Sequence, residues 1–288
     1  MKITKRDIEA LKWIAQLKYL STSLIAKYFF DDKIKVARRR LKYLFDNGYL
    51  LWFEKMQVDS RGRWERVYYL NKKRKPEINC LGGIEFSFYH PPKNPLFANH
   101  DLEIANFILC LKTCCDNHGE YTFYHQLGNE TRAVRKSNPE EDNQQSGLPF
   151  IGRNKAVFIP DALIVLQARI GKCLLFLEID TGKEVITGSF RNTADISKKL
   201  KAYKDYLSCK GYHAFANKHN FNFKGFRVLF VTSQERINHI QDLCKKIDTQ
   251  GIVWITSFDK INQGSLFNPI WHVPCAEKNE LMAIVKKN

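Results

Sequence analysis

The segment from Phe158 to Glu184 limits the folds open to this chain more than any other stretch. It reads FIPDALIVLQARIGKCLLFLEIDTGKE, and its two apolar runs, separated by a glycine, predict a pair of buried strands joined by a turn. A carboxylate stands at the start of the first strand, at Asp161. Two more stand at the end of the second strand, at Glu178 and Asp180. Pairing the strands as a hairpin brings all three to one end of the sheet.

These three acids predict a site for a hard divalent cation. Glu178 and Asp180 have the same parity along a strand, so both side chains point to one face. Carboxylates brought close together repel one another, and a cation such as Mg²⁺ or Mn²⁺ relieves that repulsion. A metal held in this way polarises a phosphodiester and activates a nucleophile. The alternative is structural, with Asp161 as a turn residue and the other two acids paired with lysines.

The elements around the hairpin predict an α/β domain over residues 98–288. Helical periodicity covers residues 99–119, 191–207 and 234–247, and strand-like runs cover residues 121–127, 226–233 and 251–257. The order is therefore helix, three strands, helix, strand, helix, strand, which is typical of a mixed α/β (α+β) sheet. Residues 128–154, before the hairpin, are polar and predict a loop.

The first quarter of the chain is a separate basic module. Residues 1–76 hold 20 Lys and Arg against 8 Asp and Glu, which is most of the net charge of +16. Thr4 and Asp7 form a capping-box pattern ahead of a helical segment at residues 5–17. Helical segments at 20–29 and 33–48 follow, and then strand-like segments at 49–58 and 63–70. This pattern predicts a winged helix-turn-helix over residues 1–77, followed by a linker over residues 78–97.

Basic side chains of this module predict a DNA-binding surface. In a winged helix the third helix enters the major groove, and the hairpin lies along the DNA backbone. A compact excess of positive charge favours a polyanionic partner such as duplex DNA. A surface kept basic for solubility and a winged helix that binds protein are the alternatives. The candidate contacts are Lys35, Arg38, Arg39 and Lys42 on the third helix, with Arg61 and Arg63 at the hairpin turn.

The acids of the second module resemble the core of the PD-(D/E)xK nucleases. Pro160-Asp161 is followed, 17 residues after the aspartate, by Glu178-x-Asp180. That interval is ordinary for this core. Asp180 departs from the pattern, because a lysine is usual at its position. The resemblance implies a restriction-endonuclease-like domain that cleaves phosphodiesters with a divalent metal.

A lysine for this core is present on the following predicted helix. Some members of the nuclease group carry their lysine there, and this chain has Lys198 and Lys199. The resemblance implies that Lys199 stabilises charge on the scissile phosphate, because it flanks the predicted buried face one turn before Tyr203. A covalent link between DNA and tyrosine would use Tyr203 or Tyr206. The alternative is that both tyrosines pack inside the domain.

Motifs along nearly the whole chain resemble the replication-relaxation family of mobile elements. They are the winged helix followed by NHDLEIANFI, PDALIVL, FLEIDTGKE, SKKLKAY, FRVLFVTSQER and VWITSFDKI…LFNPIWHVP. The related C-class mobilisation relaxases share this plan of a winged helix and a nuclease-like domain. The resemblance implies that His100 and Glu103, one turn apart on the leading helix, support the metal site. The family often has an acid near Asn106, where this chain has an amide.

Together these features predict a metal-dependent DNA nicking endonuclease of the relaxase type. The winged helix would select an origin for mobilisation or replication of a plasmid or integrative element. Asp161, Glu178 and Asp180 would hold Mg²⁺ or Mn²⁺, and other relaxosome or coupling proteins are expected partners. The alternative is a sequence-specific DNA-binding protein that regulates replication or transcription, which the missing lysine at position 180 favours. An adaptor that binds proteins in a relaxosome fits the fold but leaves the acids unexplained.

The composition disfavours several other classes. No apolar run reaches the roughly 18 residues of a membrane helix, and no apolar signal segment follows the N-terminus, so we expect a cytoplasmic protein without membrane insertion. None of the eight cysteines forms a C-x-x-C pair, which disfavours a zinc ribbon. A relaxase of the histidine type is disfavoured because His125 has no second histidine two residues away.

Overall fold

The computed structural model describes most of the chain as two compact units, Met1–Leu109 and Cys110–Asn288. The described residues are 2–55, 65–83, 88–89, 91–92, 98–128, 158–169, 171–184, 186, 195–262, 265–274 and 281–285. Nearly all of the predicted loop at 128–154 lies outside them. Among the helices in the described ranges, none has both the length and the apolar character needed to cross a membrane.

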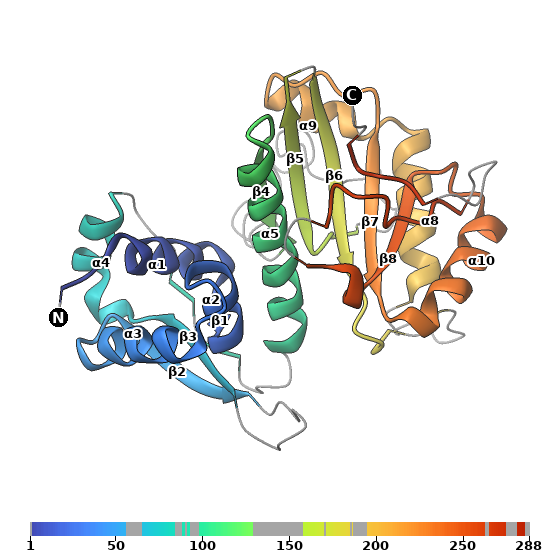
Figure 1. Ribbon diagram of the computed structural model, residues 1–288. Coiled ribbons are helices and arrows are strands. Elements are labelled where there is room, and N and C mark those ends of the chain that lie inside the picture. Colours follow the sequence, from blue (N-terminus) through green and yellow to red (C-terminus); the bar gives the residue numbers. More distant parts are fainter. Residues whose placement is uncertain are drawn as a thin grey trace. The chain divides into compact units, whose positions relative to one another are not determined.

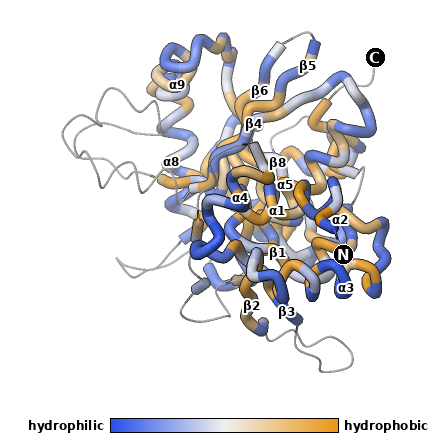
Figure 2. Tube along the Cα trace, turned by 90° about the vertical axis from the view of Figure 1, so that its left-hand side faces the viewer, coloured by the Kyte–Doolittle hydropathy of each residue, from blue (hydrophilic) through white to orange (hydrophobic). Residues whose placement is uncertain are grey.

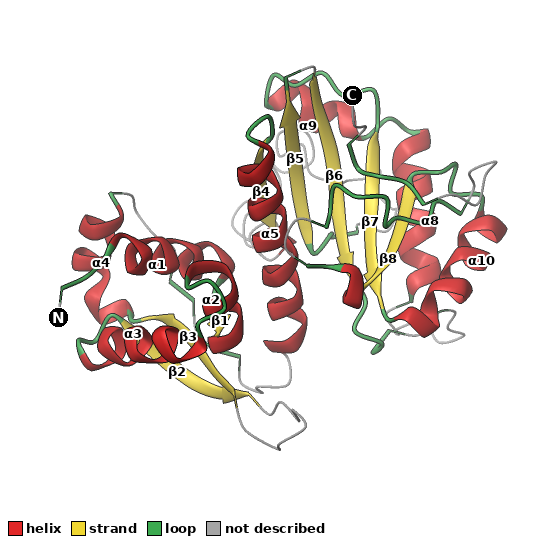
Figure 3. Ribbon diagram, viewed as in Figure 1, coloured by secondary structure: helices red, strands yellow, loops and turns green. Residues whose placement is uncertain are grey.

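The first unit has the plan of a winged helix-turn-helix (Figure 1, Figure 3). Its first three helices are α1 (Lys5–Leu17), α2 (Thr22–Phe29) and α3 (Ile34–Asp46). An antiparallel sheet in the order β1-β3-β2 consists of β1 (Leu20–Ser21), β2 (Leu50–Lys55) and β3 (Glu65–Leu70). The predicted three helices and hairpin are therefore present.

Caps and apolar stripes explain these helices. The Thr4 hydroxyl accepts a hydrogen bond from the Asp7 N–H, and the Asp7 carboxylate accepts one from the Thr4 N–H, so the predicted capping box is present. Leu11 and Ile14 on α1 and Leu41 on α3 are fully buried. Their helical spacing places them on the stripes that face the core of this unit.

A fourth helix, α4 (Lys75–Gly82), includes the start of the region predicted as a linker. It follows the short 3₁₀ turn η1 (Lys72–Arg74) and packs against α1, with Ile78 buried. Pro76 lies in the first turn, where its missing N–H breaks no helical hydrogen bond. The helix has too few apolar residues to show a period, so sequence pattern alone assigned residues 78–82 to a linker. Most of residues 84–97 lie outside the described part of the chain.

The second unit is an α/β domain built on a five-stranded sheet in the order β4-β5-β6-β7-β8 (Figure 1). Its strands are β4 (Thr122–Leu127), β5 (Ala162–Ala168), β6 (Gly171–Ile179), β7 (Phe226–Thr232) and β8 (Val253–Ser257). β4, β5 and β6 are antiparallel neighbours, whereas β6, β7 and β8 are parallel. This is the mixed α/β arrangement predicted for a restriction-endonuclease-like domain.

Helices alternate with these strands in the predicted order. The long helix α5 (Ala98–His118) precedes β4, and the boundary between the two units falls within it. The others are α8 (Ile196–Ser208), α9 (Tyr212–Lys218) and α10 (Ile237–Ile247), with 3₁₀ turns η3 (Gln234–Arg236) and η4 (Phe258–Lys260). The sequence pattern did not predict α9, which is only seven residues long.

One face of the sheet packs against α8, α9 and α10 in a single apolar cluster. The strand residues of that cluster have the same parity along each strand, as a buried face requires. β5 and β6 are hydrophilic at the turn that joins them and hydrophobic toward the opposite end (Figure 2). Asp161 and Glu178 therefore lie at the buried end of the hairpin. The main strand contributions are Leu163, Val165, Leu174, Phe176, Val228, Phe230, Val253 and Ile255.

Candidate active site

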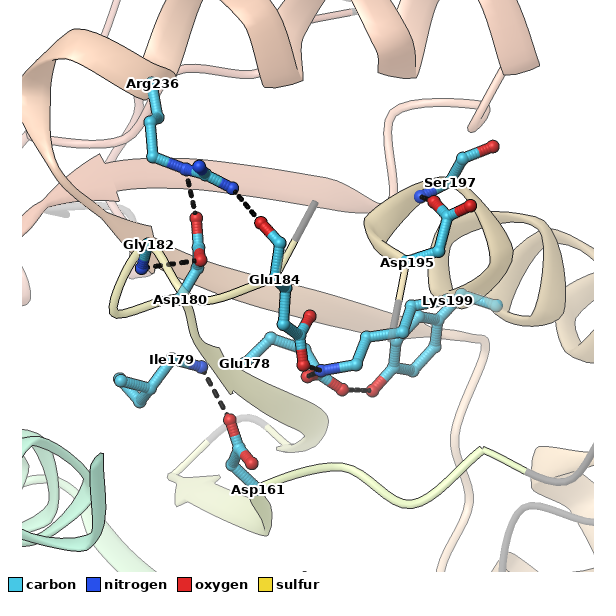
Figure 4. A network of polar contacts seen from close by, with 11 residues as sticks. Asp161, Glu178, Ile179, Asp180, Gly182, Glu184, Asp195, Ser197, Lys199 and Arg236 are labelled. Carbon is cyan, nitrogen blue, oxygen red and sulfur yellow. Dashed lines mark hydrogen bonds and ion pairs between the residues drawn. The ribbon is translucent and has the colours of Figure 1, made fainter. Parts of the chain in front are cut away.

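Asp161 lies directly before β5 and beside the end of β6. The register pairs Ala162 with Leu177, and the Asp161 N–H donates to the Leu177 carbonyl at 3.0 Å. Its carboxylate oxygen Oδ2 accepts a hydrogen bond from the Ile179 N–H at 2.7 Å. The hairpin thus brings Asp161 to the end of the strand that carries Glu178 (Figure 4).

Glu178 is buried on the face of the sheet that α8 covers, with 1% of its surface exposed. Its Oε1 accepts a hydrogen bond from the Tyr203 hydroxyl at 2.5 Å, and its Oε2 accepts one from Lys199 Nζ at 3.0 Å. Lys199 and Tyr203 are four residues apart on α8 and so face the same way. Asp195 caps this helix by accepting a hydrogen bond from the Ser197 N–H at 2.8 Å. The structure therefore places Lys199 beside the acids, where the sequence predicted it.

A further carboxylate, Glu184, belongs to the same cluster. Its Oε1 lies 2.8 Å from Lys199 Nζ, so Lys199 lies between Glu184 and Glu178 (Figure 4). Asp161 also acts on Glu178 through its charge. Glu178 and Glu184 thus share the Lys199 ammonium, and the charge of Asp161 acts on it as well. Carboxylate oxygens gathered in this way are ligands that a hard divalent cation prefers.

The surroundings shift the pKa values of this cluster. Burial raises the pKa of Glu178 to about 7; the charge of Lys199 and the Tyr203 hydrogen bond oppose that rise, and the charge of Asp161 adds to it. Burial lowers the pKa of Lys199, but the charges of Glu178, Asp161 and Glu184 outweigh burial and raise it. Lys199 is therefore charged near neutral pH, and Glu178 keeps its proton to a higher pH than a free carboxyl does.

Asp180 is not part of this cluster. Its Oδ2 accepts hydrogen bonds from Thr232 Oγ1 at 2.8 Å and from Arg236 Nε at 2.7 Å, and its Oδ1 accepts one from the Gly182 N–H at 2.9 Å. In the described ranges, no group of three His, Cys, Asp or Glu side chains is placed to hold a metal ion. The three predicted acids therefore do not form one cluster. The physical reason is that a guanidinium just before α10 neutralises Asp180.

Arg236 also holds the loop that carries Glu184. Its Nη2 donates to the Glu184 carbonyl at 2.8 Å, while its Nε donates to Asp180 (Figure 4). The loop after β6 is thus held by Arg236 through its backbone and by Lys199 through the Glu184 carboxylate. Sequence reasoning missed Arg236 and Glu184 as site residues. The sequence does carry a signal for them, because the polar runs TGKE and SQER directly follow the apolar strands β6 and β7. These strands are parallel neighbours, so the residues that follow them meet at one edge of the sheet.

Tyr203 and Tyr206 are core residues of this domain. Both are 0% exposed, and their rings pack against Phe158, Phe176 and Phe226. Burial raises the pKa of both hydroxyls, and the charge of Glu178 adds to the rise for Tyr203. A nucleophilic tyrosine must reach a phosphate and lose its proton. The packing therefore favours a role for Tyr203 in holding Glu178.

His100 and Glu103 lie on α5, in the part of that helix that belongs to the first unit. Both are half-buried. Their neighbour Asp101 packs against the winged helix, where it accepts hydrogen bonds from Lys18 at 3.1 Å and from the Tyr19 hydroxyl. Support of the metal site by His100 and Glu103 stays a prediction.

The helix α3 exposes the basic side chains that the sequence predicted for DNA contact. Arg40, which lies among them in sequence, turns inward and forms a buried ion pair with Asp7. Lys42 also pairs with Asp46 one turn later, with Nζ and Oδ2 2.8 Å apart. The predicted wing contacts Arg61 and Arg63 lie outside the described residues. The exposed set is Lys35, Arg38, Arg39 and Lys42.

The profile described as replication-relaxation matches residues 11–222. The chain belongs to the replication-relaxation family. The matched range includes Asp161, Glu178 and Lys199 and ends before Arg236. The resemblance found in the motifs is thereby confirmed, and membership indicates a role in DNA processing.

Other comparisons add little to the family assignment. None of the curated proteins compared with this replication-relaxation chain matches it. Among solved structures, the chain is similar to the restriction endonuclease FokI bound to DNA, with a TM-score of 0.27 and 13% sequence identity. That similarity covers 91% of this chain and 45% of the FokI chain, so this chain spans less than half the length of that one. At this level the likeness says nothing about individual site residues.

Proposed function

We propose that this replication-relaxation protein nicks DNA at an origin of a mobile element in a metal-dependent reaction. The observation that supports it is the charge of the cluster at the end of β6. There, among the described residues, Glu178 and Glu184 share Lys199, and Asp161 adds a third negative charge. The basic face of α3 suits the backbone of the duplex that contains the origin. In this role the protein acts in the cytoplasm with other relaxosome or coupling proteins.

The donor atoms of the cluster fit a hard divalent cation. Mg²⁺ and Mn²⁺ prefer carboxylate oxygens, and Mg²⁺ is often bound by only one or two carboxylates together with substrate phosphates. Asp161 and Glu178 are the residues that would hold it, because Arg236 already neutralises Asp180. When bound, such a metal polarises the scissile phosphodiester and activates the attacking nucleophile.

Lys199 is the residue that would compensate for the lysine absent from position 180. Its ammonium has three N–H donors. Among the described residues, the contacts to Glu178 and Glu184 use two of them, which leaves one for a phosphate oxygen. A fixed positive charge next to that oxygen stabilises the negative charge that develops as the bond breaks. Tyr203 orients the Glu178 carboxylate, and Arg236 holds the loop that carries Glu184.

A DNA-binding regulator without nuclease activity is the second candidate. The observation that favours it is Asp180 at the usual lysine position, together with a Lys199 that already has two carboxylate partners. In this reading the cluster only ties α8 to the sheet. The winged helix would bind its DNA site in either case.

A nicking assay separates the two candidates. The substrate is supercoiled plasmid that carries the origin of the native element, incubated with Mg²⁺, with Mn²⁺ or with EDTA. We expect the parent protein to form open circles only with metal, and Asp161→Asn and Lys199→Ala to form none while keeping duplex affinity. Lys198→Ala, which removes the exposed neighbouring lysine, is the matched control and should nick like the parent. Origin binding by the parent without nicking under either metal would favour the regulator.

A further inference from the structure

A small pocket lies on the winged-helix unit, between the end of α3 and the strands β2 and β3. Its volume is about 350 Å³, which is at the small end of ligand sites in proteins, roughly 300–1,000 Å³. It is separate from the acidic cluster, because all of its lining residues belong to the first unit. They are Lys42, Phe45, Asp46, Trp52, Arg66 and Tyr68.

Aromatic rings form the walls of this pocket. Phe45 is 39% exposed, which is unusual for a phenylalanine, and its ring lies 6.2 Å from that of Trp52 at a tilt of 53°. The Arg66 guanidinium lies over the Trp52 ring at 4.4 Å, so a cation–π contact fixes the plane of the indole. Tyr68 stands directly opposite Trp52 in the strand register. The walls therefore offer flat π surfaces held in place.

The rim of the pocket is mainly basic and continues the exposed face of α3. Lys42 belongs to both, and its ammonium pairs with Asp46, the one acid in the lining. Burial raises the pKa of Tyr68, and the charges of Arg66 and Arg38 oppose that rise, which shows that both arginines lie near its hydroxyl. Excess positive charge beside flat aromatic walls matches a nucleotide, whose base stacks and whose phosphate is anionic.

We infer that this pocket binds one unpaired nucleobase of a DNA substrate whose duplex part lies along the basic face of α3. A base inside a duplex is stacked on both sides and cannot enter, so the base must be extrahelical or belong to a single-stranded segment. Stacking on Phe45 and Trp52 supplies contact without sequence preference, and Lys42 and Arg66 contact the adjoining phosphates. The unit would then select a paired–unpaired junction. The inference rests on the DNA binding proposed above, and not on cleavage.

Two matched probes test this inference by fluorescence anisotropy at one salt concentration. One is a fully paired duplex, and the other is the same duplex with one additional, unpaired 2-aminopurine. We expect the parent protein to bind the second probe more tightly by about 5- to 150-fold, the range that stacking of one base on an aromatic ring supplies. The 2-aminopurine emission should also fall on binding, because stacking on an aromatic ring quenches it.

The variants are Trp52→Leu and Phe45→Leu, each checked for an unchanged melting temperature. Both should bind the paired duplex like the parent protein and lose the preference and the quenching. Phe45 is exposed, so its variant tests the inference even if Trp52→Leu fails to fold. Tyr124→Leu, which removes an exposed aromatic ring from the other unit, is the control and should keep both effects.

Each of the other outcomes overturns the inference in a different way. Equal affinity of the parent protein for the two probes would refute the base site while leaving duplex binding intact. A preference that persists in both variants would show that the unpaired base binds elsewhere. In either case the aromatic walls would be better explained by a protein partner. Failure of the parent protein to bind even the paired duplex would refute this inference and the proposed DNA binding together.

Discussion

Two buried carboxylates, one in each unit, pair with a cation and yet differ in the direction of their pKa shift. Asp7 in the winged helix is 0% exposed and pairs with Arg40. Burial by itself raises the pKa of Asp7, but hydrogen bonds from Arg40 and Thr4 outweigh burial and lower it. Glu178 in the second unit is 1% exposed and pairs with Lys199, but burial raises its pKa to about 7.

Burial is the largest cause for both groups, and the contacts that oppose it explain the difference. The Asp7 carboxylate accepts hydrogen bonds from Nε and Nη2 of Arg40 and also closes the capping box of α1. Its charge is therefore balanced, and its hydrogen bonds are satisfied. Glu178 shares its lysine with Glu184 and is repelled by Asp161. Loss of one partner from a buried pair destabilises a fold, whereas carboxylates gathered around one lysine offer ligands to an additional cation.

The largest effect should come from Asp7→Asn in the winged-helix unit. The change leaves the Arg40 guanidinium buried without its counter-charge, and loss of one partner of a buried ion pair costs about 3–5 kcal/mol. Urea unfolding monitored by circular dichroism measures this cost. Asp31→Asn, which removes an exposed carboxylate from two surface pairs, is the control and should change little. An Asp7→Asn protein as stable as its parent would show that the pair is not structural.

The next effect is a pH dependence carried by Glu178. The pKa of Glu178 in the folded protein lies above its ordinary value of 4.5. Its contribution to the free energy of unfolding is therefore fully present below pH 4.5 and is lost as the pH rises through about 7. That difference corresponds to about 3 kcal/mol. Relative to Glu178→Gln, the metal-free parent should therefore lose stability between pH 4.5 and 8. Asp7 has the opposite sign, because its contribution is present above pH 3.8 and is lost as pH falls through its lowered pKa.

Unfolding curves of both proteins in EDTA across this pH range measure the Glu178 effect. The exposed Glu235→Gln is the matched control and should follow the parent at every pH. If the difference in free energy of unfolding between the parent and Glu178→Gln stays constant with pH, then Glu178 is charged throughout, like Asp7. The two carboxylates would then not differ in the direction of their pKa shift.

A smaller loss is expected for Arg236→Ala. Asp180 keeps its contacts to Thr232 and Gly182, so the uncompensated carboxylate should cost about 3 kcal/mol, the lower end of the range for a broken buried ion pair. Because Arg236 also holds the loop of Glu184, nicking should fall while duplex affinity is unchanged. Lys245→Ala, an exposed change on α10, is the control for both measurements. A nicking rate that equals that of the parent protein would show that the loop is held without Arg236.

The smallest stability effect should come from the exposed pair of Lys42 and Asp46. A surface pair one helical turn apart contributes about 0.3–0.5 kcal/mol, so Lys42→Ala should be nearly as stable as the parent. Its DNA binding should weaken, but by less than that of Arg39→Ala, because Asp46 already compensates Lys42. Affinities over a salt series measure this, since each phosphate contact contributes about 0.9 to the log–log slope. An unchanged slope in the triple variant of Arg38, Arg39 and Lys42 would exclude α3 as the DNA surface.

Local pattern was enough to predict much of the fold and part of the site. Caps and helical periodicity depend on residues three or four apart, and so they identified α1, while short apolar runs identified the strands in their order along the chain. Lys199 was selected by the resemblance to nucleases that carry their lysine on this helix, and helical spacing only put it on the same side as Tyr203. The helix α4 was missed because its few apolar residues show no period.

The partners of the acids could not be predicted in this way. Asp180 binds Arg236, which is 56 residues away in sequence, and Asp7 binds Arg40 across 33 residues. Only the parallel register of β6 and β7 brings the first pair together. The raised pKa of Glu178 likewise depends on its burial by α8, which is a tertiary property. A sequence shows which residues carry charge, but only the fold shows which of those charges lie close enough to neutralise one another.

The central claim, that the cluster around Glu178 binds a divalent cation, is tested most directly by melting curves with and without Mn²⁺. A ligand that binds only the folded state raises the melting temperature by mass action. We predict that Mn²⁺ raises the melting temperature of the parent protein and does not change that of Asp161→Asn. In EDTA, Asp161→Asn should be at least as stable as the parent, because the change removes a repulsion between carboxylates. A parent protein indifferent to Mn²⁺, beside a destabilised Asp161→Asn, would contradict the claim and make Asp161 a structural turn residue.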